Sequence, residues 1–559
     1  MSEQSLSGSE NNARTTRRER VVLVGLTSCD QSILDRLVQA GQMPHFARLR
    51  AEGAWGRLIP AEPLVGRALW TSVATGRSPA VHGIMAGKVP RRDGGGVQPV
   101  GQTAWQHPAF WQTLQAAGRQ TITVNWPATE PATAWAGTHV DSRFARATGP
   151  DFDTWAVPRG SVGPDTLRAA LRDLRVHPTD VEGAMLAPFV PKLNEIDQYR
   201  SLSLVNLAVA LAEVSTVHAV TTALLAEQDW DVAAVHYHWL EAIQRLFLHD
   251  GIDPRFENTV DMAYMFTDAM LGRLMELAGE DTTIWVVSPN GVRPGMDGKA
   301  MGWRASGFIA ARGRWIEAGR TLDPLRLVDI APSLLARFGL VAETDGKRIP
   351  ALAPGMSRRT VMTPRPAAPA PDQHVAALRA LGYDDTPDPA MQAALTRAEA
   401  ERLLARGEAL LGAGQIAAAE AALLEARKYV SPDSPSGLRR LALCRLLRGD
   451  APGCREIGET LRRLTPRDGW GSLILAAGHA LDGNAPAAWP HMAAAKESGG
   501  SSPELMSRLG GVALMLKEDQ TARTYFETAL RMDPDLLDAR KGLDMALELS
   551  RKYEASPPA

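Results

Sequence analysis

Two histidines and a glutamate lie close together at the end of an apolar run. His236 and His238 are two residues apart on an expected strand, so their side chains point to the same face. Glu241 follows at the turn, and imidazole nitrogens with a carboxylate are ligands of Zn²⁺, so these three residues could form a zinc site. In the structural alternative, both histidines form hydrogen bonds at the strand end, and Glu241 pairs with Arg245 one helical turn further on.

Three other sequence features contain residue types that could take part in catalysis or phosphate binding. Cys29 lies near an expected helix N-terminus, where a thiol pKa is lowered, but no base is adjacent and we expect a buried small residue. Asp30 suits the N-cap of that helix. Residues 94–96 are three glycines without the following Lys-Ser/Thr of a phosphate loop, which predicts a flexible turn.

The elements that would position these residues alternate between strand and helix. Continuous apolar, β-branched runs predict strands buried on both faces, and longer apolar-periodic runs predict helices. The expected strands are 20–26, 120–125, 232–237 and 283–288, and the expected helices are 31–40, 110–117, 200–227 and 264–277. This order predicts an α/β, doubly wound and mainly parallel sheet, in which ligands bind at the carboxyl ends of the strands.

Composition excludes several classes of function. The formal net charge of −2 offers no basic excess for nucleic acid or an anionic membrane. The 3 cysteines are too few for a disulfide framework, so we expect a reducing, cytoplasmic location. The apolar stretch 202–225 is interrupted by polar residues, which favours a buried helix over a membrane span.

The length of 559 residues exceeds what one hydrophobic core holds. Residues 1–19 are polar and are expected to be disordered, and 20–349 carry the α/β pattern. Residues 350–390 form a proline-rich linker, and 391–553 are almost purely helical.

The helical part repeats with a period of about 34 residues and resembles tetratricopeptide (TPR) arrays. Small and large residues recur in one register through four units: Gly407, Ala419, Leu423 and Ala426, with Pro432 one place late; Ala442, Cys454, Leu461 and Pro466; Ala476, Ala488, Met492 and Ala495; and Leu509, Gly510, Ala522, Phe526, Ala529 and Pro534. Residues 536–553 would form the capping helix that a solenoid needs. The resemblance implies a protein or peptide partner.

Several segments of the first 350 residues resemble the type I phosphodiesterase/nucleotide pyrophosphatase family of the alkaline phosphatase superfamily. They are VVLVGL at 21–26, LWTSVATGRSPAVHGI at 69–84, TVNWPATEP at 123–131, TDAMLGRLMELAGEDTTIWVVSPNG at 267–291 and LRLVDIAPSLLARFGL at 325–340. The resemblance implies an alkaline-phosphatase-like fold. It also implies a phosphoryl-transfer site with two divalent metals, usually zinc, and a Thr or Ser nucleophile.

The matching chemical positions are altered in this sequence. The nucleophile position is Gly66, and the metal-ligand positions are Thr27, Glu241, Arg245, Pro289, Asn290 and Trp303. Of these residue types only Glu241 would bind a metal well, because a proline and a tryptophan offer no suitable donor and Arg245 brings a fixed cation. The resemblance therefore predicts a catalytically inactive domain that needs no metal cofactor.

The degenerate cleft could retain a binding role. Thr27, Asn125, Arg245 and Asn290 should cluster at the strand ends, where Arg245 could hold an anion, or Glu241 could pair with Arg245 and close the cleft. We therefore expect a non-catalytic scaffold or regulator that binds a protein through its repeats. The alternatives are an active metal-dependent phosphodiesterase with a rearranged site and an anion- or small-molecule-sensing module.

Overall fold

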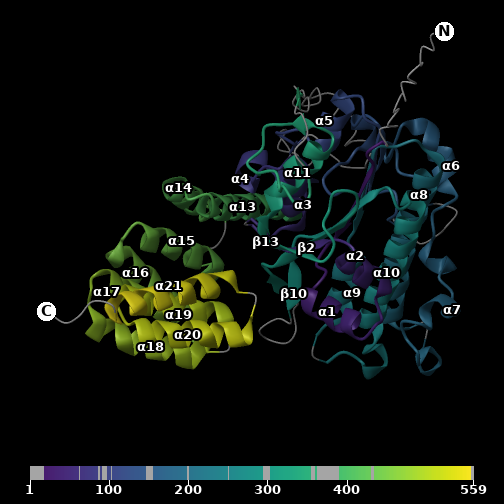
Figure 1. Ribbon diagram of the computed structural model, residues 1–559. Helices are drawn as coiled ribbons and strands as arrows, with labels where there is room; N and C mark the ends of the chain where they lie inside the picture. The colour runs from purple at the N-terminus through teal and green to yellow at the C-terminus, as the bar shows by residue number, and fades with distance from the viewer. Residues whose placement is uncertain are drawn as a thin grey trace, which may run out of the picture.

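The computed structural model describes an α/β part followed by an all-helical part (Figure 1). The described residues are 18–554 except 62, 86–87, 91–96, 102–103, 147–154, 198–199, 250, 294–301, 354–358, 362–388, 430–433, 501 and 535. The expected glycine turn at 94–96, residues 1–17 of the expected disordered lead and most of the expected linker lie outside these ranges.

A nine-stranded sheet forms the centre of the α/β part, in the order β13-β2-β12-β9-β1-β8-β5-β6-β7. Its strands are β1 (Val21–Leu26), β2 (Ala54–Ile59), β5 (Thr121–Val124), β6 (Thr138–Val140), β7 (Val162–Gly163), β8 (Val232–Tyr237), β9 (Thr283–Ser288), β12 (Gly307–Arg312) and β13 (Arg320–Arg326). β12 runs antiparallel to β9 and β2, and β7 runs antiparallel to β6, while the other pairs are parallel. The prediction of a mainly parallel sheet is therefore confirmed.

The apolar run of β1 supplies both faces of the sheet. Val22 and Val24 pack into one hydrophobic core, and Val21 and Leu23 pack into the other, because successive side chains of a strand point to opposite faces. Burial on both sides explains why the run is continuous rather than alternating.

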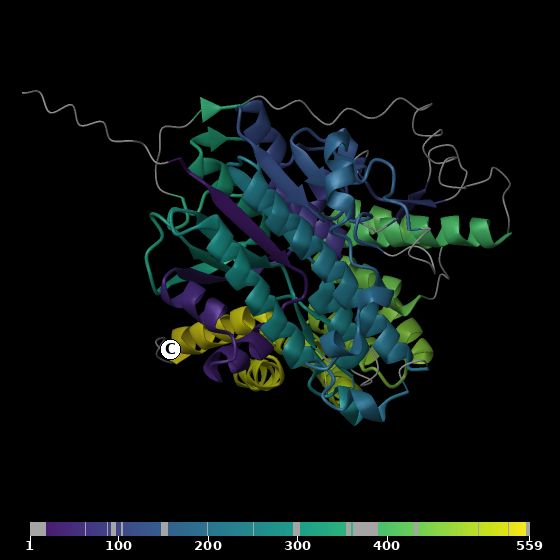
Figure 2. The same cartoon turned by 90° about the vertical axis from the view of Figure 1, so that its right-hand side faces the viewer.

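Helices cover both faces of the sheet, and Figure 2 shows helices in teal and blue lying across the purple strand β1. The first core contains α1 (Gln31–Gln39), α2 (Pro44–Ala51), α8 (Leu202–Glu227), α9 (Trp239–Phe247) and α10 (Thr259–Ala278). The second contains α3 (Gly66–Thr75), α5 (Phe110–Ala116) and α11 (Ile330–Arg337). By length and composition α8 could cross a membrane, but 56% of its most apolar window is buried inside the protein.

Helix α10 begins at Thr259, five residues before the expected start at Tyr264. Thr259 donates a hydrogen bond to the Phe189 carbonyl at 3.0 Å, and Val260 and Ala263 are buried in the first core. Tertiary packing at the first turn therefore extends the helix beyond its apolar periodicity.

The α/β part extends past both expected boundaries. Glu19, placed in the disordered lead, pairs with the buried Arg337 at 2.6 Å. Arg337 also donates to the Leu352 carbonyl at 2.7 Å, and Leu352 is fully buried in the second core, although the linker was expected to begin at 350. A short strand β15 (Arg359–Thr360) then pairs with β14 (Leu340–Val341). Arg337 thus contacts both ends of the α/β part, because a buried charge needs polar partners close to it.

In the helical part, the described residues form four successive helix pairs and a final helix. The elements are α13 (Pro389–Gly412), α14 (Ile416–Ala426), α15 (Pro435–Leu447), α16 (Ala451–Leu464), α17 (Trp470–Leu481), α18 (Ala485–Gly499), α19 (Pro503–Met515), α20 (Asp519–Met532) and α21 (Leu537–Glu554). The second helices of the pairs begin 34 or 35 residues apart, and the expected seam residues Ala419, Cys454, Ala488 and Ala522 have no exposed surface.

The helical array contacts the α/β part at two places. Helix α13 packs on α4 (Pro79–His82) and on the hairpin of β3 (Lys88–Pro90) and β4 (Val97–Pro99). At the other end of the array, Asp533 lies 3.9 Å from Arg304 of β11 (Gly302–Arg304). Figure 1 shows the array beside β10 (Gly291–Arg293), which follows the carboxyl end of β9, so the array lies toward the carboxyl ends of the parallel strands.

Candidate functional site

Three neighbouring parallel strands end at one group of polar side chains. β1 is followed by Thr27, β5 by Asn125, and β8 carries His236 next to its last residue. The strands are adjacent in the sheet, and the Thr27 N–H donates to the Tyr237 carbonyl at 2.9 Å. The expected meeting of Thr27 and Asn125 at the strand ends is therefore observed, with His236 between them.

A chain of hydrogen bonds runs through Thr27. The Trp70 indole N–H donates to Thr27 Oγ1 at 2.8 Å, and Thr27 Oγ1 lies 2.6 Å from His236 Nε2. Because a hydroxyl has one proton, Thr27 receives from Trp70 and donates to His236. The indole of Trp70 also packs edge-on against the His236 ring, with centroids 4.8 Å apart.

The hydrogen bond of the other imidazole nitrogen, Nδ1, fixes which nitrogen of His236 carries the proton. Nδ1 lies 3.1 Å from the Asn125 carbonyl, which accepts its proton, and the Asn125 side-chain amide donates to the His236 carbonyl at 2.8 Å. Asn125 adopts φ = 58°, a left-handed conformation that asparagine tolerates. Burial lowers the pKa of His236 well below its usual value, so the imidazole is neutral.

A second polar group lies after β9. The Asn290 amide donates to Ser28 Oγ at 2.9 Å, and the Ser288 hydroxyl accepts from the Cys29 N–H at 3.1 Å. Asp30 caps α1 as expected, accepting from the Ser32 N–H at 2.9 Å. The other Asp30 oxygen accepts from the Val292 N–H at 3.1 Å and lies 3.6 Å from Arg304 Nη1.

The candidate zinc residues have other partners. His236 uses both ring nitrogens in the hydrogen bonds above, and His238 Nε2 lies 3.4 Å from Glu213. Glu241 pairs with Arg245 at 2.7 Å, as the structural alternative predicted. Among the residues that the structure describes, no group of three or more His, Cys, Asp or Glu side chains is placed to hold a metal.

Gly66 stands at the first residue of α3, where the resemblance places the nucleophile. A Cβ added here would meet no atom within 4 Å, so the position has room for a side chain. Glycine is therefore not required by packing at this place, in contrast to Gly25, whose Cβ would come within 2.6 Å of Trp70.

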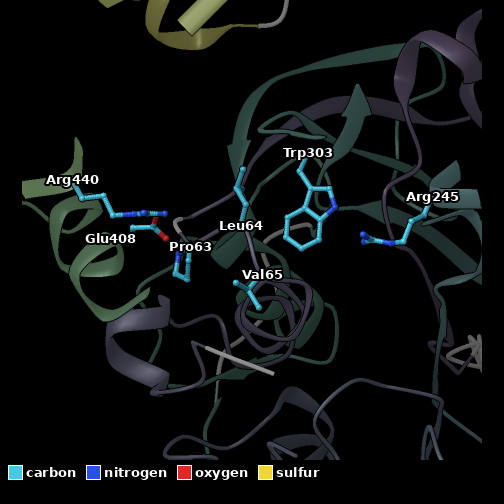
Figure 3. Close-up of a pocket in the computed structure, with 7 residues that line it drawn as sticks. All are labelled: Pro63, Leu64, Val65, Arg245, Trp303, Glu408 and Arg440. Carbon is cyan, nitrogen blue, oxygen red and sulfur yellow. The ribbon is translucent and has the colours of Figure 1, made fainter. Parts of the chain in front are cut away.

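Arg245 and Trp303 border an open cavity of about 480 Å³, and Figure 3 shows the Arg245 guanidinium directed toward the indole. Residues 63–65, just before α3, line its middle, and Glu408 and Arg440 of the helical array line its far side. Asn290 is 2% exposed and does not line this cavity. Of the predicted cleft residues, Thr27, Asn125 and Asn290 are therefore buried, whereas Arg245 and Trp303 line an open cavity.

The donor atoms do not suit the two divalent metals of the resembled family. The Thr27 hydroxyl is committed to Trp70 and His236, Pro289 and Trp303 offer no ligand oxygen or imidazole, and Arg245 carries a positive charge. Cys29 is fully buried, and burial raises its thiol pKa well above the usual range, which opposes a nucleophilic role.

Sequence reasoning missed the partners that complete these groups: Trp70, Ser28, Glu213 and Arg304. Trp70 lies within the quoted segment 69–84, and Ser28 lies between Thr27 and Cys29, but no spacing rule links an indole N–H to a strand end 43 residues earlier. Their roles follow only from the three-dimensional arrangement.

The mostly parallel sheet with helices on both faces is an alkaline-phosphatase-like architecture. A family model described as type I phosphodiesterase / nucleotide pyrophosphatase matches residues 21–306, about half of the chain, and the chain belongs to this family. No curated protein matches the chain significantly.

Among solved structures, the chain is similar to phosphonoacetate hydrolase from Sinorhizobium meliloti 1021 in complex with phosphonoformate. The identity is 22% and the TM-score 0.32, over 51% of this chain and 59% of that chain. The same hydrolase in complex with phosphonoacetate matches with 22% identity and a TM-score of 0.32, over 50% and 58% of the two chains.

Proposed function

We propose that this chain is a non-catalytic member of the type I phosphodiesterase family, a scaffold or regulator whose helical array is of the tetratricopeptide type and binds a protein partner. The observation that carries the proposal is the closed hydrogen-bond chain Trp70–Thr27–His236–Asn125 at the strand ends. Where the resembled family presents metal ligands, these side chains satisfy one another.

The remaining polar groups support the same conclusion. Asp30 is occupied by backbone N–H groups and Arg304, and Glu241 by Arg245. Two-metal phosphoryl transfer needs a hydroxyl nucleophile and anionic ligands aimed at a shared centre. Gly66 has no hydroxyl and Arg245 repels a cation, so the described strand ends lack the parts that this reaction uses.

Partner binding is supported by the repeating helix pairs. Each pair buries small residues between its helices, which leaves the first helices α15, α17 and α19 side by side as one extended face. The three cysteines are buried and unpaired, which suits a reducing cytoplasm.

The catalytic half of the proposal is tested by metal content and turnover together. The purified full chain is measured by elemental analysis, and hydrolysis of bis(p-nitrophenyl) phosphate is followed with and without added Zn²⁺ or Mn²⁺. We expect less than about 0.1 metal per chain and no turnover above buffer, since the two-metal ligand set is lost.

A value near two metals per chain with turnover would overturn the proposal and favour the alternative, an active hydrolase with a rearranged site. The variant Glu241→Gln is the matched control, because it removes the best remaining metal-ligand type while keeping the shape of the side chain. Turnover that persists unchanged in this variant would come from a contaminant or from a site elsewhere.

A further inference from the structure

An apolar hollow of about 320 Å³ lies on the extended face of the helical array. Its floor comes from α15, α17 and α19 and includes Leu446, Trp470, Leu473, Val512 and Met515. Met515 is 37% exposed, so part of the floor is open to solvent. We call this hollow the array groove; an apolar surface of this kind fits the side chains of a ligand.

The charge of the array groove has one sign. Arg439, Arg440 and Arg508 line it, and none of the described residues that line it is acidic. The partners of these arginines lie outside its lining: Asp468, Glu408 and Asp538. The arginine side chains keep 34%, 31% and 48% of their surface exposed, so their ion pairs can be exchanged at little cost.

Arg440 belongs to two hollows at once. It lines the array groove, and it also lines the cavity of about 480 Å³ that Arg245 and Trp303 border on the opposite wall. In Figure 3 the guanidinium of Arg440 points into this second cavity from the array side, and that of Arg245 points into it from the α/β side. Arg440 is therefore a wall that the array groove and this cavity share.

We propose that the array groove and the degenerate cleft form one composite site for an acidic, apolar peptide segment of a partner protein. The apolar side chains of the peptide lie on the floor near Trp470 and Met515. In the cavity of about 480 Å³, one carboxylate of the peptide replaces Glu408 at Arg440, and a second replaces Glu241 at Arg245 on the opposite wall, each held by charge-assisted hydrogen bonds. This deepens the proposed partner-binding function and rests on it.

The competing intramolecular pairs set the chemistry of the ligand. Arg440 is held by Glu408, and Arg245 by Glu241, so the ligand must offer a carboxylate of its own to replace them. Both pairs are partly exposed, which makes the exchange nearly neutral, and the net gain comes from the apolar floor. A purely anionic small molecule lacks that gain, and a purely apolar peptide leaves the arginines with their present partners.

The test starts from the full-length chain and a phage library of random dodecapeptides. Panning on the wild type is expected to enrich sequences with an excess of both Asp/Glu and Leu/Ile/Met/Phe. The most enriched peptide is then labelled with fluorescein, and its Kd is measured by anisotropy. We expect Arg440→Ala and Arg245→Ala each to weaken binding about tenfold or more, as the loss of a charged hydrogen bond predicts.

The floor is tested by Met515→Glu, which places a like charge beside the peptide and should also weaken binding about tenfold or more. The matched controls are Met545→Glu on α21 and Arg523→Ala on α20, which are exposed and do not line the array groove. Both should keep the Kd within about twofold of the wild type, since surface changes away from a site have small effects. Circular dichroism confirms that each variant is folded.

Each outcome of the binding experiments tests a separate part of the two proposals. Enriched peptides without acidic excess, or a Kd unchanged by Arg440→Ala, would overturn the composite site. Binding that depends on Met515 but not on Arg245 would leave the partner-binding array intact and remove the cleft from it. Displacement of the peptide by dodecathymidylate at lower concentration than by unlabelled peptide would indicate a nucleic-acid site instead. Failure to enrich any peptide would count against both proposals, whereas turnover in the hydrolase assay would affect only the non-catalytic one.

Discussion

Removing the Thr27 hydroxyl should destabilise the α/β part far more than its size suggests. Thr27→Val keeps the shape of the side chain but takes away the acceptor of the Trp70 N–H and the donor to His236 Nε2, which lie 2.8 and 2.6 Å from Oγ1. Trp70 is 1% exposed and His236 4%, so water does not readily replace the hydroxyl. Each buried group left without a partner costs about 1–3 kcal/mol, and we expect a total loss of about 3 kcal/mol.

The assay is urea unfolding of the wild type and the variant, followed by tryptophan fluorescence under the same conditions. Thr71→Val is the matched control, because Thr71 is equally buried but donates only to the Arg67 carbonyl one turn earlier in α3. We expect the control to lose less than about 1 kcal/mol, since the carbonyl keeps its helical environment. Equal losses in the two variants would refute the idea that the strand ends are held by this hydrogen-bond chain.

Two further predictions concern buried histidines and glycines. Burial lowers the pKa of His82 and of His139 to about 3. Below pH 6.5 the unfolded chain therefore binds protons that the folded chain does not. The free energy of unfolding should be highest above pH 6.5 and fall on acidification. Between pH 6.5 and 5.5 each should cost about 1 kcal/mol in urea unfolding, and a flat profile would contradict the assigned burial. Gly66→Ser should change the unfolding free energy by less than about 0.5 kcal/mol, whereas Gly25→Ala should cost about 1–3 kcal/mol because its Cβ would press on Trp70. Thermal scans of both variants check this, and a stable Gly25→Ala would show that Trp70 can move aside.

The central strands could be predicted from sequence because burial on both faces imposes a continuous apolar run. The expected strands at 232–237 and 283–288 match β8 and β9 residue for residue. The edge of the domain could not be predicted in this way. Leu352 lies at the start of the proline-rich stretch that indicates a linker, yet it is buried, and the Arg337 guanidinium binds its carbonyl. A long-range contact to one buried charge leaves no periodic signal.

In the candidate site, too, one part could be predicted from the sequence and another could not. Thr27 and Asn125 follow strands, so the rule that strand ends converge was enough to bring them together. That rule could not predict the hydrogen-bond partners of Thr27 and Asn125. These depend on Trp70, which reaches Thr27 from α3, and on His236, which faces inward at 4% exposure. His238, two residues further on, lies beyond the end of β8 as the N-cap of α9 and meets Glu213 on α8, so the expected shared strand face is not formed.

The chemistry of the strand ends explains how this fold can be stable with uncharged residues where the resemblance places metal ligands. A cluster of carboxylates at these positions would bury several like charges, which only bound cations or protonation can offset. Thr27 and Asn290, which the resemblance places at two of these positions, are uncharged, and both form hydrogen bonds within the protein. Arg245 forms a partly exposed pair with Glu241 and faces the cavity that the helical array also lines. We therefore expect the strand ends to be stable without a bound cation, and the charge of Arg245 faces the cavity where we propose that the partner binds.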